Sequence, residues 1–172
     1  NIDYIIIGEG EQSLPFLLKN LHKSLDREQI AETINNLDDL PLPDYKLFGS
    51  HCMVQQYKYS HVFVAKKPFA LTMTTRGCPY RCIFCSSCKL HKQVRFRSAE
   101  NVLREIDWLR QKYGINEIIF IDDSFILNKE KVIKLMKGLK ELSIRWKPIH
   151  LPLFLLTEEI LSSISFTSSA GN

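Results

Sequence analysis

The chain has 172 residues, which is enough for one hydrophobic core of ordinary size but hardly for two complete domains. Its 23 Lys and Arg residues against 19 Asp and Glu residues give a net charge of +4, spread along the chain, and this weak excess does not favour a nucleic-acid partner. No apolar run approaches the length of a membrane span and the N-terminus lacks a secretion-signal pattern, so the sequence predicts a cytoplasmic protein.

Residues 1–30 are expected to be the C-terminal end of a doubly wound α/β domain. The apolar run "DYIIIGEGE" ends on Gly8 and Gly10, as a buried strand does when it runs into a tight turn. A helix is predicted to follow, because leucines recur there at helical spacing: Leu14, Leu17, Leu18, Leu21 and Leu25. A strand and a helix without the preceding strands indicate that the front of such a domain is absent.

Residues 31–68 are predicted to be a linker and a lead-in segment. The string "NNLDDLPLPDYKLFGS" mixes acidic, proline and apolar residues without a period, which is typical of an extended connection. The run "HVFVA", at residues 61–65, is a candidate strand. The domain boundary is therefore placed in this segment.

Residues 69–172 are predicted to form repeated strand and helix units. The strings "FALTMTT", "EIIFI" and "IRWKPIHLP" are typical of strands, and an apolar helical pattern follows each. Ser98 and Asn128 are predicted to cap the first two helices and Gly114 to end the first, whereas the Ser-rich end "SFTSSAGN" is not expected to continue the third. This alternation predicts an α/β fold with parallel strands. Three units cannot close a barrel, so the chain is expected to be a fragment.

Four of the five cysteines lie within eleven consecutive positions, in the stretch "TTRGCPYRCIFCSSCKL". In a reducing cytosol such a cluster holds metal or does chemistry more often than it forms disulfides. Cys78, Cys82 and Cys85 have the spacing C-x3-C-x2-C and follow a strand, on the side where parallel α/β folds place their active sites. Three thiolates on a four-iron cluster leave one iron open, and an open coordination position is typical of a catalytic metal centre.

Two other metal sites are compatible with the same cysteines. Cys88 as a fourth thiolate, with His91 nearby, would complete a structural zinc site, although zinc ligands usually come as two separated pairs. The four cysteines also form a run close to the reverse of a ferredoxin motif, which would make the loop an electron-transfer site. Cys88 is expected to bind no metal, because a ligand there would close the open iron, and Cys52 is expected to be an ordinary small residue.

Several strings resemble those of one enzyme family. The pattern Cys78-x-x-x-Cys82-x-Phe84-Cys85 is similar to the signature of the radical S-adenosylmethionine (SAM) superfamily, in which an aromatic residue usually precedes the third cysteine. The longer string "TTRGCPYRCIFCS" resembles the version found in the cobalamin-binding branch. "DYIIIGEGE" looks like the end of that branch's cobalamin-binding domain, "LDDLPLPDY" looks like its connector, and "IIFIDDSF" looks like the second strand of the radical core with its acidic end.

This resemblance implies a fold and a reaction. Residues 69–172 would be about the first three units of a parallel (β/α) barrel, the truncated radical SAM core, and residues 1–30 the end of a Rossmann-like cobalamin-binding domain. The enzyme would cleave SAM reductively to a 5'-deoxyadenosyl radical, leading to methyl transfer, rearrangement or cyclisation. Its cofactors would be a [4Fe–4S] cluster, SAM and cobalamin. Because the later strands of the core are missing, this chain alone is not expected to turn over.

The resemblance also assigns roles to individual residues. The cluster ligands would be Cys78, Cys82 and Cys85. The cofactor-binding residues would be Phe84 beside the adenine, Asp122, Asp123 and Ser124 at the methionyl amino group, and Gly8, Glu9 and Gly10 on the cobalamin side. The two aspartates have a plainer alternative use in capping a strand end, and the two glycines in making a tight turn.

The expected partners are a small-molecule or natural-product-type substrate and a reductant such as flavodoxin or ferredoxin. No nucleic acid and no membrane span are expected. Two other functions remain open, namely a radical SAM enzyme without cobalamin and a non-catalytic iron–sulfur electron carrier. A cluster whose spectrum ignores SAM would distinguish the carrier from either enzyme.

Overall fold

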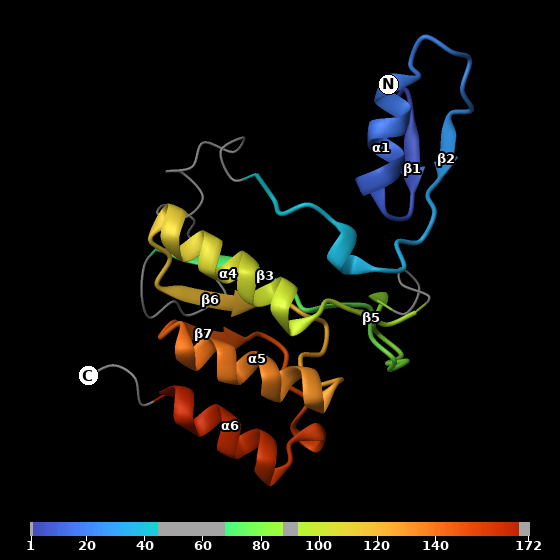
Figure 1. The fold of residues 1–172 in the computed structure, drawn as a ribbon. Coiled ribbons are helices and arrows are strands. Elements are labelled where there is room, and N and C mark those ends of the chain that lie inside the picture. The colour runs from blue at the N-terminus through green and yellow to red at the C-terminus, as the bar shows by residue number, and fades with distance from the viewer. Residues whose placement is uncertain (1, 45–67, 88–92, 169–172) are drawn as a thin grey trace. The chain divides into compact units, whose positions relative to one another are not determined.

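The structure is a computed structural model that describes residues 2–44, 68–87 and 93–168. The chain divides into two compact units, Asn1–Leu40 and Pro41–Asn172, and each is described by itself (Figure 1). The predicted strand at 61–65 and the side chains of Cys52, Cys88 and His91 lie outside the described residues. Within the described ranges, no helix is both long and apolar enough to cross a bilayer.

The first unit is a small parallel β-α-β piece. Strand β1 (Ile5–Ile7) leads into helix α1 (Gly10–Lys19), and the chain returns in strand β2 (Glu28–Ile30), which pairs in parallel with β1. A 3-10 turn, η1 (Leu37–Asp39), follows. The predicted strand, turn and helix are confirmed, but the strand is not buried, because Ile5 and Ile7 are 38% and 49% exposed. Strand β2 was not predicted, because three residues with one apolar side chain at the end carry no clear period.

Helix α1 is shorter than its leucine pattern predicted. It ends at Lys19, so Leu21 and Leu25 lie beyond it and the predicted extension is wrong. Asn20 ends the helix, because its side-chain amide donates to the carbonyl of Phe16 at 2.8 Å and its backbone N–H to that of Leu17 at 3.0 Å. These bonds satisfy carbonyls that a further helical turn would otherwise have used.

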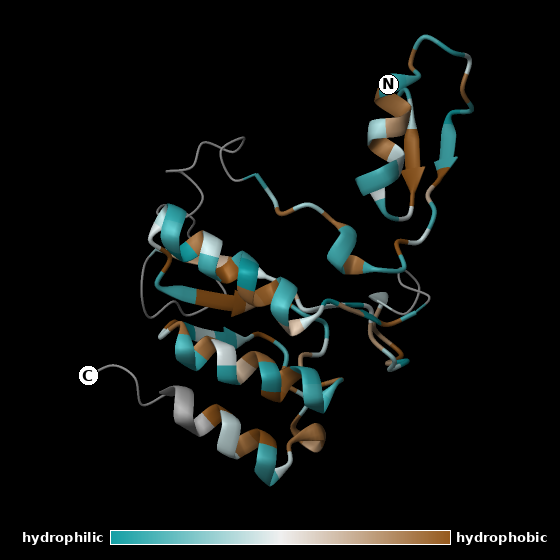
Figure 2. Ribbon diagram, in the orientation of Figure 1, coloured by the Kyte–Doolittle hydropathy of each residue, from teal (hydrophilic) through white to brown (hydrophobic). Residues whose placement is uncertain are grey.

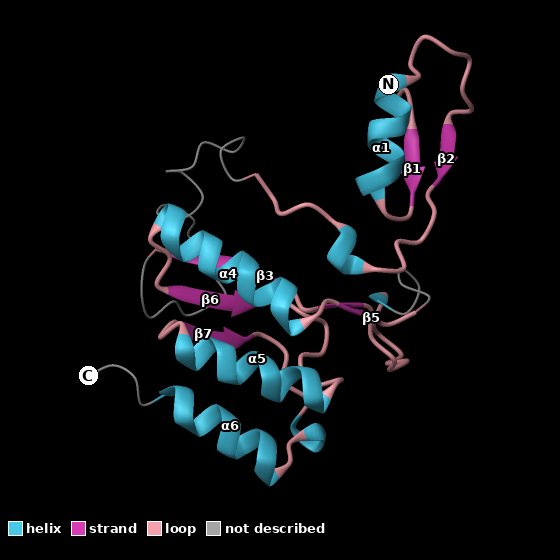
Figure 3. Cartoon of the chain, in the orientation of Figure 1, coloured by secondary structure: helices cyan, strands magenta, loops and turns pink. Residues whose placement is uncertain are grey.

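The second unit contains a three-stranded parallel sheet with helices between its strands. The sheet order is β3 (Phe69–Thr72), β6 (Glu117–Phe120), β7 (Arg145–Pro148), with β6 in the middle. Helix α4 (Ala99–Tyr113) follows β3, α5 (Lys129–Glu141) follows β6, and α6 (Glu158–Ser168) follows β7 (Figure 3). The predicted α/β class and the parallel arrangement are confirmed.

Helix α6 extends further than predicted. It runs to Ser168, so the expectation that the Ser-rich end would not continue the helix is wrong as far as that residue. Ser162 and Ser163 are tolerated inside the helix because their hydroxyls donate to the carbonyls of Glu158 and Ile160, each at 2.7 Å. Such bonds to the preceding turn let serine sit in a helix without an unpaired hydroxyl.

The core of the second unit is centred on β6. All four residues of β6 are buried, and the helices turn apolar side chains towards the sheet. Figure 2 shows this division, with brown on β6 and teal along the outer faces of α4 and α5. Phe120 packs against Phe125 and Trp146, with ring centroids 4.8 and 6.0 Å away. This aromatic cluster therefore fixes the carboxyl end of β6, where the chain turns towards Asp122.

The predicted helix ends of the second unit are confirmed. The hydroxyl of Ser98 accepts from the N–H of Asn101 at 3.1 Å, and the side chain of Asn128 accepts from the N–H of Lys131 at 3.0 Å. Each bond satisfies one of the N–H groups that the first turn of a helix leaves unpaired. Gly114 ends α4 in the left-handed conformation, with φ +64°.

Replacing Gly114 with Ala is expected to lower the free energy of unfolding by about 1 kcal/mol, because a β-carbon is strained in the left-handed conformation. Gly114→Asn is the matched control and is expected to cost less, since Asn tolerates this conformation better. Urea denaturation of the three proteins measures the difference. Equal losses for Ala and Asn would contradict a conformational cause.

A small antiparallel pair interrupts the predicted first strand of the unit. The string "FALTMTT" contains the end of β3 at Thr72 and, after a break, the start of β4 (Thr75–Arg76), which pairs antiparallel with β5 (Arg95–Phe96). Thr75 lies opposite Phe96, and Arg76 opposite Arg95. This pair joins the two ends of the segment that carries the cysteines. We call residues 77–94 the cysteine loop.

Candidate functional site

The predicted site residues of the second unit lie at the carboxyl ends of β3 and β6. The cysteine loop leaves the sheet just after β3, and Asp122 follows β6 by two residues. Carboxyl ends of neighbouring parallel strands share one edge of a sheet, which is where such folds bind ligands. The structure therefore brings the cysteine loop and the acidic end of β6 to the same edge of the sheet.

Asp122 holds the N-terminal base of the cysteine loop. Its Oδ1 accepts from the backbone N–H and the hydroxyl of Thr74, both at 2.8 Å, and from the N–H and hydroxyl of Thr75, at 2.6 and 2.8 Å. Asp122 is only 2% exposed. Four donors on one oxygen fix the direction in which the chain enters the loop.

Two buried oxygen atoms near this point have no partner. In the part of the chain that the structure describes, neither Asp122 Oδ2 nor the hydroxyl oxygen of Ser124 makes a hydrogen bond. Both residues are almost fully buried. An unpaired buried polar atom is costly, so two of them on residues two positions apart mark a place where a ligand or water can bind.

Burial raises the pKa of Asp122 above its ordinary value of 3.8, although the bonds from Thr75 and Thr74 act in the opposite direction. The folded chain therefore holds the proton of this carboxyl more tightly than the unfolded chain does. Protonation of Asp122 consequently favours the folded state. The contribution of this protonation to the free energy of unfolding is largest below pH 3.8, and it declines as the pH rises through the raised pKa of Asp122.

Asp122→Asn is expected to remove this decline while keeping an oxygen that can accept from the two threonines. The free energy of unfolding, measured by urea denaturation at a series of pH values from below 3.8 upwards, should therefore fall less in the variant than in the natural chain. The difference in the free energy of unfolding between the two proteins should level off at pH values where Asp122 of the natural chain is ionised in both the folded and the unfolded state. A difference that is constant across the series would contradict the assigned titration.

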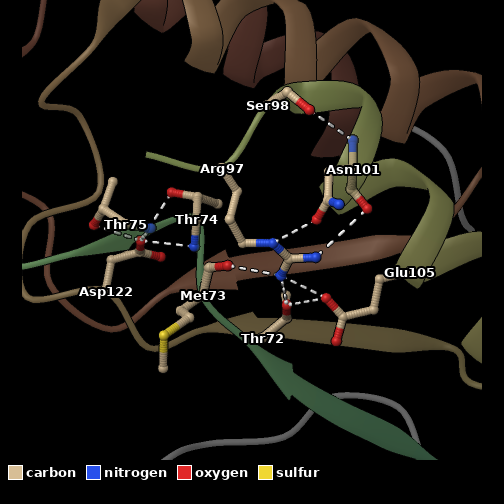
Figure 4. Close-up of polar contacts among 9 residues, drawn as sticks. All are labelled: Thr72, Met73, Thr74, Thr75, Arg97, Ser98, Asn101, Glu105 and Asp122. Carbon is tan, nitrogen blue, oxygen red and sulfur yellow. Dashed lines mark hydrogen bonds and ion pairs between the residues drawn. The ribbon is translucent and has the colours of Figure 1, made fainter. Parts of the chain in front are cut away.

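A largely shielded arginine joins the two ends of the cysteine loop. Arg97, just after β5, donates from one guanidinium nitrogen to the carboxylate of Glu105 at 2.5 Å and to the carbonyl of Met73 at 3.0 Å. Its Nε donates to the side chain of Asn101 at 2.7 Å. Glu105 also accepts from the hydroxyl of Thr72 at 3.0 Å. Figure 4 shows the guanidinium between these groups, with Asp122 facing the two threonines beside it.

This network ties residues before the loop to residues after it. Arg97 also donates its backbone N–H to the carbonyl of Thr74 at 2.8 Å. The ion pair is well shielded, with side-chain exposures of 12% for Arg97 and 3% for Glu105. A shielded ion pair whose remaining donors and acceptors are also satisfied specifies one geometry.

The three cysteines of the C-x3-C-x2-C motif are present as thiols. Cys82 is exposed, whereas Cys78 and Cys85 are partly buried. The N–H of Cys85 donates to the carbonyl of Cys82 at 3.0 Å, so a turn links the last two cysteines. Among the described residues, no three His, Cys, Asp or Glu side chains are grouped closely enough to hold a metal ion.

The chemistry of this donor set fits an iron–sulfur cluster. Thiolates are the ligands that such clusters use, and three occur within eight residues on one loop, Cys78 to Cys85. The tip of the loop lies at the surface, with Ile83 102% and Phe84 89% exposed, so it is not held in place by core packing. Binding of a cluster would have to draw the three sulfur atoms together, and an exposed tip allows this.

The structure places the other predicted residues as follows. Phe84 projects from the loop into solvent. The carboxylate of Asp123 accepts from the hydroxyl of Ser87, which lies in the loop after Cys85, at 2.6 Å. The predicted contacts of both residues with SAM stay predictions.

Gly8, Glu9 and Gly10 belong to the first unit. Gly8 has φ +113°, and a β-carbon there would lie 3.2 Å from that of Ala31, so glycine is required for the turn and for close approach. The carboxylate of Glu9 accepts from the N–H of Ile34 at 2.9 Å. A β-carbon at Gly10 would meet no atom within 4 Å. Gly8 and Glu9 thus have structural uses, and the predicted cobalamin contacts of all three stay predictions.

Sequence reasoning missed the buried network around Arg97. Glu105 lies among Val102, Ile106 and Leu109 on the apolar face of α4, and a charged residue in that stripe was the available signal. A carboxylate on a buried helix face requires a cationic or hydrogen-bonding partner. No local sequence pattern connects Glu105 to Arg97, which lies eight residues before it.

Comparison with known proteins gave one family match. The model of the Radical SAM superfamily matches residues 72–165, a span that includes the cysteine loop, β6, β7 and most of α6. The match therefore covers all of the predicted site residues in the second unit.

Three relatives illustrate the range of similar proteins. An uncharacterized methyltransferase, PH0819 of Pyrococcus horikoshii, is 35% identical over 84% of this chain and 34% of its own length. An anaerobic magnesium-protoporphyrin IX monomethyl ester cyclase of Cereibacter sphaeroides is 29% identical over 77% of this chain and 24% of its own. A cytidylyl-2-hydroxyethylphosphonate methyltransferase of Streptomyces wedmorensis is 28% identical over 94% and 38%. The chain thus spans about a third or less of the length of the first two relatives.

Proposed function

Because the chain belongs to the radical SAM superfamily, we propose that Cys78, Cys82 and Cys85 hold a [4Fe–4S] cluster for radical chemistry on SAM. The observation that carries this proposal is the position of the three thiols. They lie on a loop that is anchored at the carboxyl edge of a parallel sheet, inside the span that matches the family. When bound, such a cluster supplies the electron for reductive cleavage of SAM.

The residues at the end of β6 would bind the methionyl part of SAM. Asp122 Oδ1 is fully used by the two threonines, so Asp122 would act through Oδ2. That oxygen and the hydroxyl of Ser124 are both buried and without a partner in the described part of the chain, which suits them to accept from an ammonium group. Asp123, which carries an exposed bond to Ser87, is the third predicted contact.

Phe84 would pack against the adenine of SAM. Its side chain is 89% exposed and immediately precedes Cys85, so a nucleoside bound beside the cluster would cover an aromatic ring that is otherwise in water. Contact between this ring and a flat base is favourable, because it buries apolar surface area and because the two rings can stack. This would order the tip of the cysteine loop around the bound cofactor.

The larger protein would belong to the cobalamin-binding branch. In support, the first unit has the parallel β-α-β arrangement of a Rossmann-like domain end, and the second has three parallel strands with intervening helices, as in the first units of a (β/α) barrel. The division of the chain after Leu40 supports a linker within residues 31–68, between a domain end at 1–30 and a radical core at 69–172. Gly10, where a β-carbon would meet no atom within 4 Å, would leave room for cobalamin, and Gly8 and Glu9 would shape the turn beside it.

The reaction would be methyl transfer or a cyclisation or rearrangement of a small-molecule substrate. Relatives named as methyltransferases and as cyclases support this range. A reductant such as flavodoxin or ferredoxin would deliver the electron. The exposed loop, with Cys82 at the surface, is compatible with electron delivery from outside.

Anaerobic reconstitution tests the proposal. The chain is incubated with iron and sulfide, freed of excess reagent, and examined by metal analysis and by electron paramagnetic resonance of the reduced protein with and without SAM. We expect about four irons per chain and a spectrum that changes when SAM is added. Zinc without iron after anaerobic purification would favour a structural zinc site. A cluster whose spectrum ignores SAM would favour an electron carrier.

A further inference from the structure

Beyond its base, the cysteine loop contacts the rest of the second unit through Ser87 and Tyr80. The hydroxyl of Ser87 donates to Oδ2 of Asp123 at 2.6 Å. The ring of Tyr80 meets the ring of Phe154 edge to face, with centroids 5.4 Å apart and an angle of 80° between the planes. Phe154 lies in the 3-10 turn η3 (Leu153–Leu155), which follows β7. The loop is thus attached to the segments that follow β6 and β7.

These two contacts flank the cysteines. Tyr80 lies between Cys78 and Cys82, and Ser87 lies two residues after Cys85. The turn from Cys82 to Cys85 is therefore held between a ring contact on one side and a hydrogen bond on the other. Because Asp122 and Arg97 also fix the base, the described part of the loop before Ser87 is attached at both of its ends.

From this arrangement we propose that Ser87 and Asp123 form a latch that positions the Cys85 end of the cysteine loop for metal binding. The part of this inference that concerns the cluster rests on the proposed function. The two consecutive aspartates after β6 then have separate tasks. Asp122 fixes the end of the loop that precedes the cysteines, and Asp123 fixes the end that follows them.

The physical basis is the entropy of the loop. The bond between Ser87 and Asp123 holds the chain near Cys85 against the end of the sheet. This removes many loop conformations in which the Cys85 sulfur is far from the sulfur atoms of Cys78 and Cys82. A short hydrogen bond from a hydroxyl to a carboxylate is stronger than one between two neutral groups, because the acceptor is charged. The bond is exposed, so it contributes little to the stability of the core while restricting the loop.

Hydrogen exchange in the metal-free chain tests the latch directly. Ser87→Ala is expected to speed exchange of the amides around Cys85 by about 2- to 10-fold, the range that one hydrogen bond of modest net strength corresponds to. Ser86→Ala is the matched control, because Ser86 is an exposed neighbour in the same loop, and it should leave these amides unchanged. Asp123→Ala should match Ser87→Ala, and the double variant should add nothing further.

A second measurement connects the latch to the cluster. In reconstituted protein, a chelator should remove iron faster from Ser87→Ala than from Ser86→Ala, with the same thermal midpoint for both metal-free chains. Exchange rates that are equal in Ser87→Ala and Ser86→Ala would overturn the latch. Failure of the natural chain to bind iron would instead contradict the proposed function, and the exchange data from the metal-free chain would still decide the latch.

Discussion

Cys82→Ala is expected to reduce the iron retained after anaerobic reconstitution to the background level. Three thiolates are the complete protein contribution to the proposed cluster, and two cannot hold it against a chelator or a desalting column. Cys82 is exposed, so the variant should fold with an unchanged thermal midpoint in the metal-free state. Loss of iron would then report on ligation rather than on stability.

The chain provides its own controls for this measurement. Cys52→Ala and Cys88→Ala remove a thiol from the same chain and should retain iron and sulfide at the natural level. A loss in Cys88→Ala comparable to that in Cys82→Ala would place Cys88 among the ligands. That result would remove the open iron on which the proposed chemistry depends.

Glu105→Ala is expected to lower the free energy of unfolding by about 3 to 5 kcal/mol, because it leaves the shielded guanidinium of Arg97 without its carboxylate. The loss also leaves the hydroxyl of Thr72 without its acceptor. Chemical denaturation measures the effect. The same variant should loosen both ends of the cysteine loop, since Arg97 contacts residues on each side of it.

Two controls separate the buried pair from ion pairs in general. Glu100→Ala, in the same helix, breaks an exposed pair with Lys134 and should cost at most about 1 kcal/mol. The double variant Glu105→Leu with Arg97→Met replaces the pair by apolar side chains and should recover much of the stability lost in Glu105→Ala. A cost for Glu105→Ala no larger than that for Glu100→Ala would show that water reaches the Arg97 guanidinium freely.

The elements that the sequence predicted correctly are those with strong local signals. Ser98, Asn128 and Gly114 act through hydrogen bonds and backbone conformations within a few residues of themselves, so their roles as helix ends could be predicted. The parallel order followed from the alternation of strands and helices. The cysteine spacing likewise lies within one loop, which is why it could be identified without knowing the fold.

The features that the sequence did not predict depend on distant partners or very short elements. Asp122 and Thr74 are 48 residues apart, and Glu105 is 33 residues from Thr72, so no local pattern joins them. Strands β4 and β5 have two residues each, which is too short for a period. Helix α1 stops early because one asparagine side chain competes for its carbonyls, an effect that the leucine spacing does not contain.

The antiparallel pair β4 and β5 has a consequence for how the loop tolerates changes in length. Because this pair and the Arg97 network close the base, residues inserted between 77 and 94 would extend the tip without shifting the register of β3 against β6. The base thus separates the cysteine loop, whose length can vary, from the parallel sheet, whose strand register cannot. A protein built in this way can acquire a longer or differently shaped loop at little cost to the sheet beneath it.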